Sequence, residues 1–104
     1  MPRRAFDGLT ESMLYVLMAL VGGEKCGSDI ALTVTDRSGG RVRLGPATLY
    51  TILAKFQEEK FIRETAVEGR KRTYALTEKG ESVYKNELLR LECCLRDAKR
   101  GKSE

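Results

Sequence analysis

One stretch decides the fold of this chain, residues 45–62, which read Gly45-Pro46-Ala47-Thr48-Leu49-Tyr50-Thr51-Ile52-Leu53-Ala54-Lys55-Phe56-Gln57-Glu58-Glu59-Lys60-Phe61-Ile62. Glycine is an accepted N-cap and proline is favoured at the first helical position, so the stretch predicts a helix that begins at Pro46. Its apolar residues recur at i, i+3, i+4 and i+7, which is the spacing of one buried helical face. These residues are Leu49, Ile52, Leu53 and Phe56.

The opposite face of this helix is small and hydroxylic. At about 100° per residue, it carries Ala47, Thr48, Thr51, Ala54, Lys55 and Glu58, with Tyr50 on the flank. A solvated helix face usually carries several charges, whereas small hydrogen-bonding residues near a helix N-terminus suit an approach to base edges in a major groove. Taken alone, the pattern also fits an ordinary surface helix, so the rest of the chain must decide.

Composition limits the class of protein. The chain has 104 residues, 41% apolar and 33% charged, which suits one soluble domain. Its longest apolar run, Met13–Val21, is shorter than the ~18 residues of a membrane span. No secretory signal follows the N-terminus. Cys26, Cys93 and Cys94 are an odd count at no metal or redox spacing, so we expect a reduced, cytoplasmic setting and no metal or cofactor.

Positive charge is concentrated in the segment that contains the predicted helix. Residues 37–72 hold nine basic and four acidic side chains, a net charge of +5, whereas the whole chain carries +4. A local basic surface suits a polyanion through phosphate neutralisation and counterion release. Arg41 and Arg43 are expected to be structural or surface charges. Arg3 and Arg4 could form a loose basic arm, although a solvated chain end is the simpler interpretation.

The remaining patterns predict the other elements. Thr10 can cap a helix that ends at Gly22-Gly23, and Gly27 or Ser28 can cap a second helix, with Ile30, Ala31 and Val34 inward, that ends at Ser38. Polar and apolar alternation predicts a short strand over 41–44. A hairpin with strands over 61–67 and 72–76 turns at Glu68-Gly69-Arg70-Lys71, and a last helix, capped by Thr77, spans 78–100.

Three helices followed by a two-stranded ribbon are typical of a winged helix-turn-helix domain. In that plan the third helix enters the major groove, and the ribbon, or wing, lies along the backbone or the minor groove. We therefore predict an α+β, mainly α fold. Residues 1–77 form the winged helix-turn-helix DNA-binding domain, and residues 78–104 form a C-terminal dimerisation helix with a polar tail, together one compact unit.

Five motifs also resemble the PadR-type transcriptional regulators, over about residues 9–95. They are Leu9-Thr10-Glu11, Gly27-Ser28-Asp29-Ile30, Leu44-Gly45-Pro46-Ala47-Thr48-Leu49-Tyr50, Glu58-Glu59-Lys60-Phe61-Ile62 and Tyr74-Ala75-Leu76-Thr77-Glu78-Lys79-Gly80. The short length is similar to the subfamily with a single C-terminal dimerisation helix. The resemblance implies a homodimeric repressor on a palindromic operator, with Tyr50 at a position that typically contacts DNA.

The chain departs from the family pattern at three positions. Ser28 stands where the family commonly has tyrosine, and Thr51 where it commonly has proline. Lys60 replaces a usual glycine after the third helix, so a non-glycine residue is expected in the left-handed conformation there. The chain also has no tryptophan, so the holding of flat aromatic ligands between tryptophans, attributed to some small members, does not carry over. A small-molecule effector is left open.

The predicted DNA contacts divide by chemistry. Thr48 and Thr51 can hydrogen-bond base edges or touch a thymine methyl, and Lys55 can reach guanine or phosphate. The basic tip of the hairpin suits phosphates or a narrow minor groove, which gives affinity with little sequence information. The full set of predicted DNA-facing residues is Ala47, Thr48, Tyr50, Thr51, Lys55, Arg70, Lys71 and Arg72.

A heptad pattern in the last helix predicts a dimer interface. Apolar residues follow 4-3-4-3 spacing over about two heptads, with Cys94 beside them: Tyr84, Leu88, Leu91, Cys94, Leu95 and Ala98. Packing on the chain's own first helix is the simpler alternative. We expect both, with the first turn packed internally and the rest against a second copy. Cys93 and Cys94 suggest a redox sensor, but small residues filling the side of a helix are the simpler interpretation.

Two other classes of function compete with DNA binding. An enzyme is not expected, because the chain has no histidine for triads, metal sites or neutral-pH proton transfer. Residues 22–28 resemble a phosphate-binding loop only superficially, since the lysine that should follow the second glycine is missing. A winged-helix module that binds protein is the alternative, which the basic wing and the hydroxylic helix face argue against.

Overall fold

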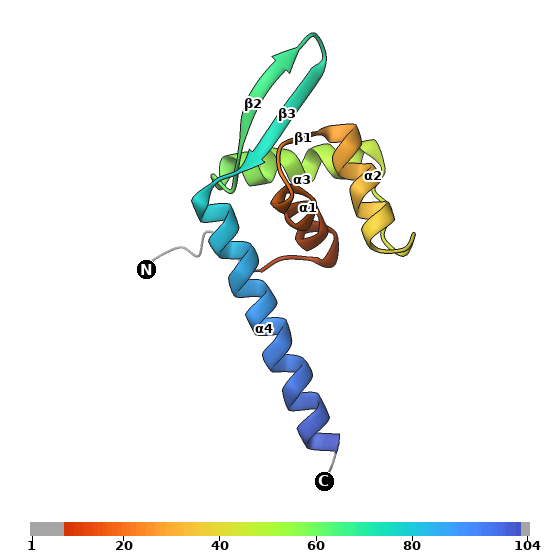
Figure 1. Ribbon diagram of the computed structural model, residues 1–104, viewed down its shortest axis with the longest axis vertical. Helices are drawn as coiled ribbons and strands as arrows, with labels where there is room; N and C mark the ends of the chain where they lie inside the picture. Colours follow the sequence, from red (N-terminus) through yellow and green to blue (C-terminus); the bar gives the residue numbers. More distant parts are fainter. Residues whose placement is uncertain (1–7, 103–104) are drawn as a thin grey trace.

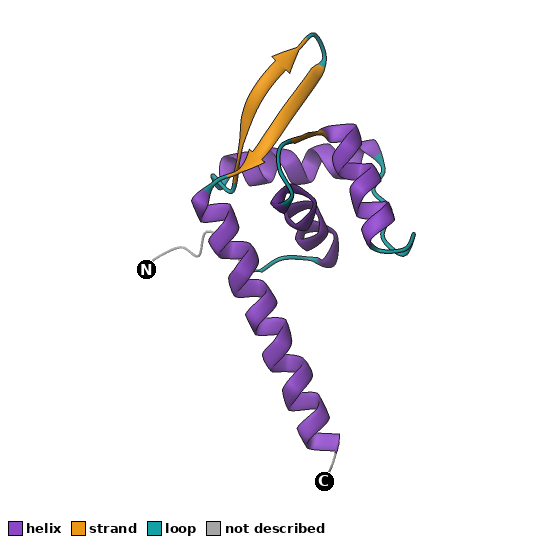
Figure 2. Cartoon of the chain, viewed as in Figure 1, coloured by secondary structure: helices purple, strands orange, loops and turns teal. Residues whose placement is uncertain are grey.

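The computed structural model describes residues 8–102, and four helices and three strands form this part of the chain (Figures 1 and 2). The order confirms the predicted mainly helical α+β plan with a hairpin after the third helix. The elements are α1 (Glu11–Val21), β1 (Lys25–Cys26), α2 (Gly27–Arg37), α3 (Pro46–Glu58), β2 (Ile62–Glu68), β3 (Lys71–Leu76) and α4 (Glu78–Lys102). None of these helices is both long enough and apolar enough to cross a membrane.

The sheet is antiparallel, with strand order β1-β3-β2. The hairpin register runs from Ile62 opposite Leu76 to Glu68 opposite Lys71, with an irregularity between Glu64 and Ala66. Its strand bounds differ by one residue from the prediction, so the turn is Gly69-Arg70. The hairpin projects from the helical body as a wing (Figure 2).

The short strand was predicted in the wrong place. Residues 41–44 follow an irregular path, in which the buried Val42 donates its backbone N–H to Ser38 Oγ at 2.9 Å. The observed third strand, β1, lies before α2, where Lys25 and Cys26 pair with Tyr74 and Thr73. A two-residue strand exists because a partner edge is available to it, and no local alternation reveals that edge.

The apolar stripe of α3 packs into the core as predicted. Leu49, Ile52, Leu53 and Phe56 are all buried, and Phe56 is fully so. They meet side chains of α1 and α2, together with Phe61, which precedes β2, and Tyr74 of β3. Burial of this stripe fixes the rotation of α3, so its opposite face must point outward.

Both ends of α3 behave as the sequence indicates. Gly45 is the N-cap and Pro46 occupies the first turn. Beyond the C-terminal end, Lys60 has a φ of 67°, which confirms the expected left-handed residue. This turn lets the Phe61 N–H bond to the Phe56 carbonyl at 2.8 Å and sends the chain into β2. The predicted cap of α2, Gly27 or Ser28, was wrong, since the extended Cys26 takes that position without a side-chain hydrogen bond to the helix backbone.

Helix α4 begins against the body and then leaves it. The Thr77 hydroxyl accepts from the Gly80 N–H at 3.0 Å, and Val83 and Tyr84 pack on the core. Residues 89–101 are exposed throughout, and this half of α4 projects away from the wing (Figure 1). The first half of α4 is therefore part of the domain, whereas the second half makes little contact with it.

Candidate nucleic-acid interface

The outward face of α3 is the first component of the candidate interface. Ala47, Thr48, Thr51, Ala54 and Lys55 are all exposed. Tyr50, on the flank, is 51% exposed. The first two turns therefore present methyl and hydroxyl groups, with Lys55 as the first charge, and this face can approach base edges without burying unpaired charges.

The wing is the second component. Gly69 takes a φ of 62° at its tip, and Arg70 follows it in the turn. Lys71 and Arg72 are the first residues of β3 and are exposed. Arg70 and Arg72 line the space toward α3, whereas Lys71 does not. The hairpin thus directs two of its three consecutive cations toward the helix that carries the hydroxylic face.

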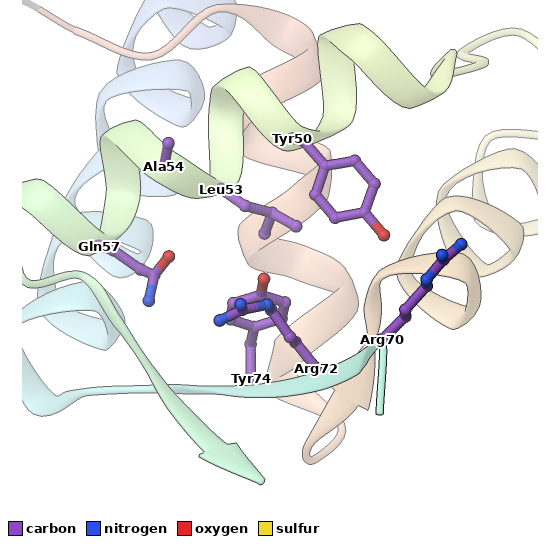
Figure 3. Close-up of a pocket in the computed structure, with 7 residues that line it drawn as sticks. All are labelled: Tyr50, Leu53, Ala54, Gln57, Arg70, Arg72 and Tyr74. Atoms are coloured by element: carbon purple, nitrogen blue, oxygen red, sulfur yellow. The ribbon is translucent and has the colours of Figure 1, made fainter. Parts of the chain in front are cut away.

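A notch of about 280 Å³ separates α3 from the wing (Figure 3). Its lining is Tyr50, Leu53, Ala54 and Gln57 from α3, and Arg70, Arg72 and Tyr74 from the hairpin side. In Figure 3, Tyr50, Leu53 and Gln57 point from the helix toward the strand, and Arg72 and Tyr74 rise from the strand toward the helix. No lining side chain is acidic, and several can donate hydrogen bonds.

Tyr50 holds its place because α2 offers it room. A Cβ added at Gly27 would lie 2.6 Å from the Tyr50 hydroxyl oxygen and 3.1 Å from the adjoining ring carbon. Only glycine therefore lets the ring lie this close to the first turn of α2. Sequence reasoning identified Tyr50 but missed this role of Gly27, since the contact joins two elements through a loop.

An ion pair on the wing was also missed. Arg72 Nη1 donates to both carboxylate oxygens of Glu64, at 3.0 and 3.2 Å. Glu64 lies opposite the buried Tyr74 in the hairpin register. Burial raises the pKa of the Tyr74 phenol, and the Glu64 carboxylate raises it further, so Tyr74 stays a protonated hydrogen-bond donor. Gln57 and Tyr74 thus join the predicted residues that line the notch, and Glu64 is bonded to one of them, Arg72.

Of the arginines outside the predicted DNA-binding set, Arg41 and Arg43 are structural or surface charges, as expected. Arg41 Nη1 donates to Glu11 at 2.6 Å and its Nη2 to the Tyr15 hydroxyl at 3.0 Å, which fastens the loop before α3 to α1. These bonds to Glu11 and Tyr15 raise the pKa of Arg41. Arg43 donates to the Gly40 carbonyl. Arg3 and Arg4 lie outside the described residues.

The predicted dimer residues follow one line along α4. Tyr84 and Leu88 are half-buried, whereas Cys94 and Ala98 are exposed. Leu91 and Leu95 are 39% and 58% exposed. This line of side chains extends beyond the part of α4 that packs on the core. Its pairing with a second copy stays a prediction.

The predicted interface region of α4 also carries charge and thiols. Arg90 bonds to Glu87 at 2.6 Å, and this bond lowers the pKa of the Glu87 carboxyl. Cys93 and Cys94 are free and exposed, with Cys94 Sγ 3.8 Å from Arg90 Nη1. A redox role for these thiols stays a hypothesis. Among residues 8–102, no three histidine, cysteine, aspartate or glutamate side chains group as metal ligands would.

Comparison with known sequences identifies the family. Residues 16–86 match the model of the Transcriptional regulator PadR-like family. A curated relative, an uncharacterized 37.1 kDa protein in transposon TN4556 of Streptomyces fradiae, is 32% identical over 77 residues, which cover 74% of this chain and 22% of the relative. The chain therefore spans less than a quarter of the length of that relative.

Solved structures agree at the level of the fold. A transcriptional regulator from Clostridium thermocellum, Cth-833, superposes with a TM-score of 0.75 at 21% identity, covering 86% of this chain and 87% of that one. Bacillus subtilis PadR, solved in complex with operator DNA, gives 0.65 at 26% identity, covering 73% and 45%. The predicted winged-helix architecture is thereby confirmed. The family consists of transcriptional regulators and not of enzymes, and this chain is a member of the PadR-like family.

Proposed function

We propose that the chain is a sequence-specific DNA-binding transcriptional regulator, a repressor that acts in the cytoplasm as a homodimer on a palindromic operator. One observation carries the proposal: the flank of α3 beside its hydroxylic face, with Tyr50 and Ala54, lines the same notch as Arg70 and Arg72 of the wing. A major-groove helix and a cationic ribbon in this relation suit one duplex. The operator complex of B. subtilis PadR supports it by similarity.

Within this proposal, the two components perform different tasks. Thr48 and Thr51 contact base edges, and Lys55 contacts guanine or phosphate. Arg70, Lys71 and Arg72 bind phosphates, which position the protein on the duplex without reading sequence. The second half of α4 pairs with its counterpart, so that two copies of α3 reach successive major grooves on one face of the duplex.

Selection of bound sequences from a random pool of duplexes tests the whole proposal. A two-fold symmetric site is the expected result. An asymmetric site would contradict the homodimer, and failure to enrich any duplex would favour the alternative, a winged-helix module that binds protein.

Two substitutions test whether α3 contacts bases while the wing contacts phosphates. We expect Arg70→Ala to weaken binding to every duplex and to reduce the slope of log affinity against log salt by about 0.9 for each phosphate that the variant no longer neutralises. Thr51→Ala should instead change the preference at one or two base pairs. Fluorescence anisotropy on a panel of operator variants measures both effects.

Arg96→Ala serves as the matched control, because it removes one exposed cation from the far end of α4. It should leave both the salt slope and the base preference unchanged. If Arg70→Ala and Thr51→Ala affected every operator variant equally, the assignment of α3 to bases and the wing to phosphates would be wrong.

A further inference from the structure

The wing carries a carboxylate where a DNA-binding surface should be cationic. Glu64 bonds to Arg72 Nη1 through both of its oxygens, at 3.0 and 3.2 Å. The Glu64 side chain is 24% exposed and that of Arg72 is 55% exposed. Glu64 lies opposite Tyr74, and Arg72 precedes Tyr74 by two residues, so all three share one face of the hairpin.

The notch beside this ion pair is suited to an anion. Its polar lining consists of hydrogen-bond donors from both sides: the guanidinium groups of Arg70 and Arg72, the hydroxyls of Tyr50 and Tyr74, and the amide of Gln57. The volume of about 280 Å³ accommodates a phosphodiester group with part of its sugars. Guanidinium groups match phosphate oxygens in charge and in fork geometry.

We propose that this notch holds one backbone phosphate of bound DNA, and that Glu64 is an internal carboxylate that occupies Arg72 until the phosphate displaces it. The inference rests on the proposed DNA-binding function. It adds a named binding site for one phosphate and a named side chain, Glu64, that competes with this phosphate for Arg72. Because the bound group is a phosphate, the notch contributes equally to the affinity for every duplex sequence.

The exposure of the ion pair makes the exchange feasible. Both side chains keep access to water, so the pair is weakened by solvent and salt and costs little to break. A phosphate arriving from the duplex replaces the carboxylate as the partner of Arg72, and Glu64 turns toward solvent. Until then Glu64 neutralises one cation of the wing and repels approaching phosphates, so it lowers the affinity for all duplexes.

Glu64→Gln tests this inference, since it keeps the size of the side chain and removes its charge. The matched control is Glu68→Gln, which removes one negative charge from the exposed end of the same strand. A labelled random-sequence duplex and a duplex enriched by selection are titrated with each variant at fixed salt. We expect Glu64→Gln to bind both duplexes about two- to fivefold more tightly than Glu68→Gln does.

The coupling to Arg72 is tested in a double-mutant cycle. In an Arg72→Ala background the extra gain from Glu64→Gln should disappear, because the carboxylate then has no cation to occupy. Far-ultraviolet circular dichroism verifies folding, and Glu64→Met supplies a second uncharged side chain of similar length.

The outcomes separate the inference from the proposed function. If the unmodified protein binds neither duplex, DNA binding itself is overturned. If it binds, but Glu64→Gln gains no more than Glu68→Gln, or gains equally without Arg72, the role of Glu64 is overturned alone. A loss of affinity in both Glu64→Gln and Glu64→Met would show that the ion pair orders the wing for DNA, which also contradicts the competitor role.

Discussion

Gly80, in the first turn of α4, lies against the backbone of Phe61. A Cβ added at Gly80 would overlap the Phe61 carbonyl oxygen and lie 2.8 Å from its carbonyl carbon. We expect Gly80→Ala to lower the free energy of unfolding by about 1–3 kcal/mol, because α4 must move away from Phe61. Urea denaturation at one fixed protein concentration measures the change.

Gly101 offers a control in the same helix. A Cβ there would meet nothing within 4 Å, so Gly101→Ala should leave stability unchanged or raise it by at most about 0.5–1 kcal/mol through helix propensity. Equal effects of the two substitutions would mean that the close approach of α4 to Phe61 does not contribute to stability.

Residues that belong to one helix face were predictable from the sequence, and residues that depend on a neighbouring element were not. Thr48, Thr51 and Lys55 are exposed because helical periodicity and the burial of the apolar stripe determine where they point. Gln57 lines the notch, and Glu64 bonds to Arg72 beside it, only because the hairpin folds back over α3. That placement depends on the register of the sheet, which side-chain patterns do not encode.

At the scale of elements, long periodic segments were predicted and short strands were not. Helices α1 and α3 have caps and a full apolar stripe, so their ends were found from local chemistry. Strand β1 has two residues and exists only because it pairs with β3. The alternation at residues 41–44 contains just two apolar side chains, and the chain there uses Ser38 as a hydrogen-bond partner in place of a strand.

The junction of α3, β3 and α4 depends on one hydroxyl group. Thr77 Oγ1 donates to the Lys60 carbonyl at 2.6 Å and accepts from the Gly80 N–H at 3.0 Å. We expect Thr77→Val, which keeps the shape of the side chain, to reduce the free energy of unfolding more than Thr10→Val at the start of α1. The Thr10 hydroxyl accepts one bond, from the Met13 N–H at 3.2 Å.

The expected magnitudes follow from the hydrogen bonds that each substitution removes. Removal of a helix cap costs about 0.5–2 kcal/mol, and the additional bond to Lys60 should add about 0.5–1.5 kcal/mol for Thr77→Val. Chemical denaturation of both variants under identical conditions measures the difference. Equal decreases in stability would indicate that the bond between Thr77 and Lys60 adds nothing to the cap.

At the scale of the whole molecule, the chain is elongated, with extents of 58 × 40 × 22 Å. The wing projects in one direction and the second half of α4 in the opposite one (Figure 1). A helix without a partner along half its length gains little from propensity alone. Its exposed leucines on the predicted heptad line, Leu91 and Leu95, are therefore the part of the surface where a second copy has most to bury.

Leu95→Glu tests that interface more cleanly than Leu91→Glu. Leu91 also lines the groove between α1 and α4 within one chain, so a charge there disturbs the monomer as well. Leu95 is 58% exposed and lies on the predicted heptad line, whereas Leu89 is 59% exposed and lies roughly 120° around the helix from it. The two leucines lie on different faces of α4 but are almost equally exposed, so Leu89→Glu is the matched control.

We expect Leu95→Glu to be monomeric, because pairing would bring two carboxylates together in an apolar seam. Leu89→Glu should keep the oligomeric state of the unmodified protein. Light scattering over a range of concentrations measures this. Operator affinity should fall only for Leu95→Glu, since two half-sites are then no longer engaged by one assembly. Dimers of Leu95→Glu, or monomers of Leu89→Glu, would place the interface on a different face of α4.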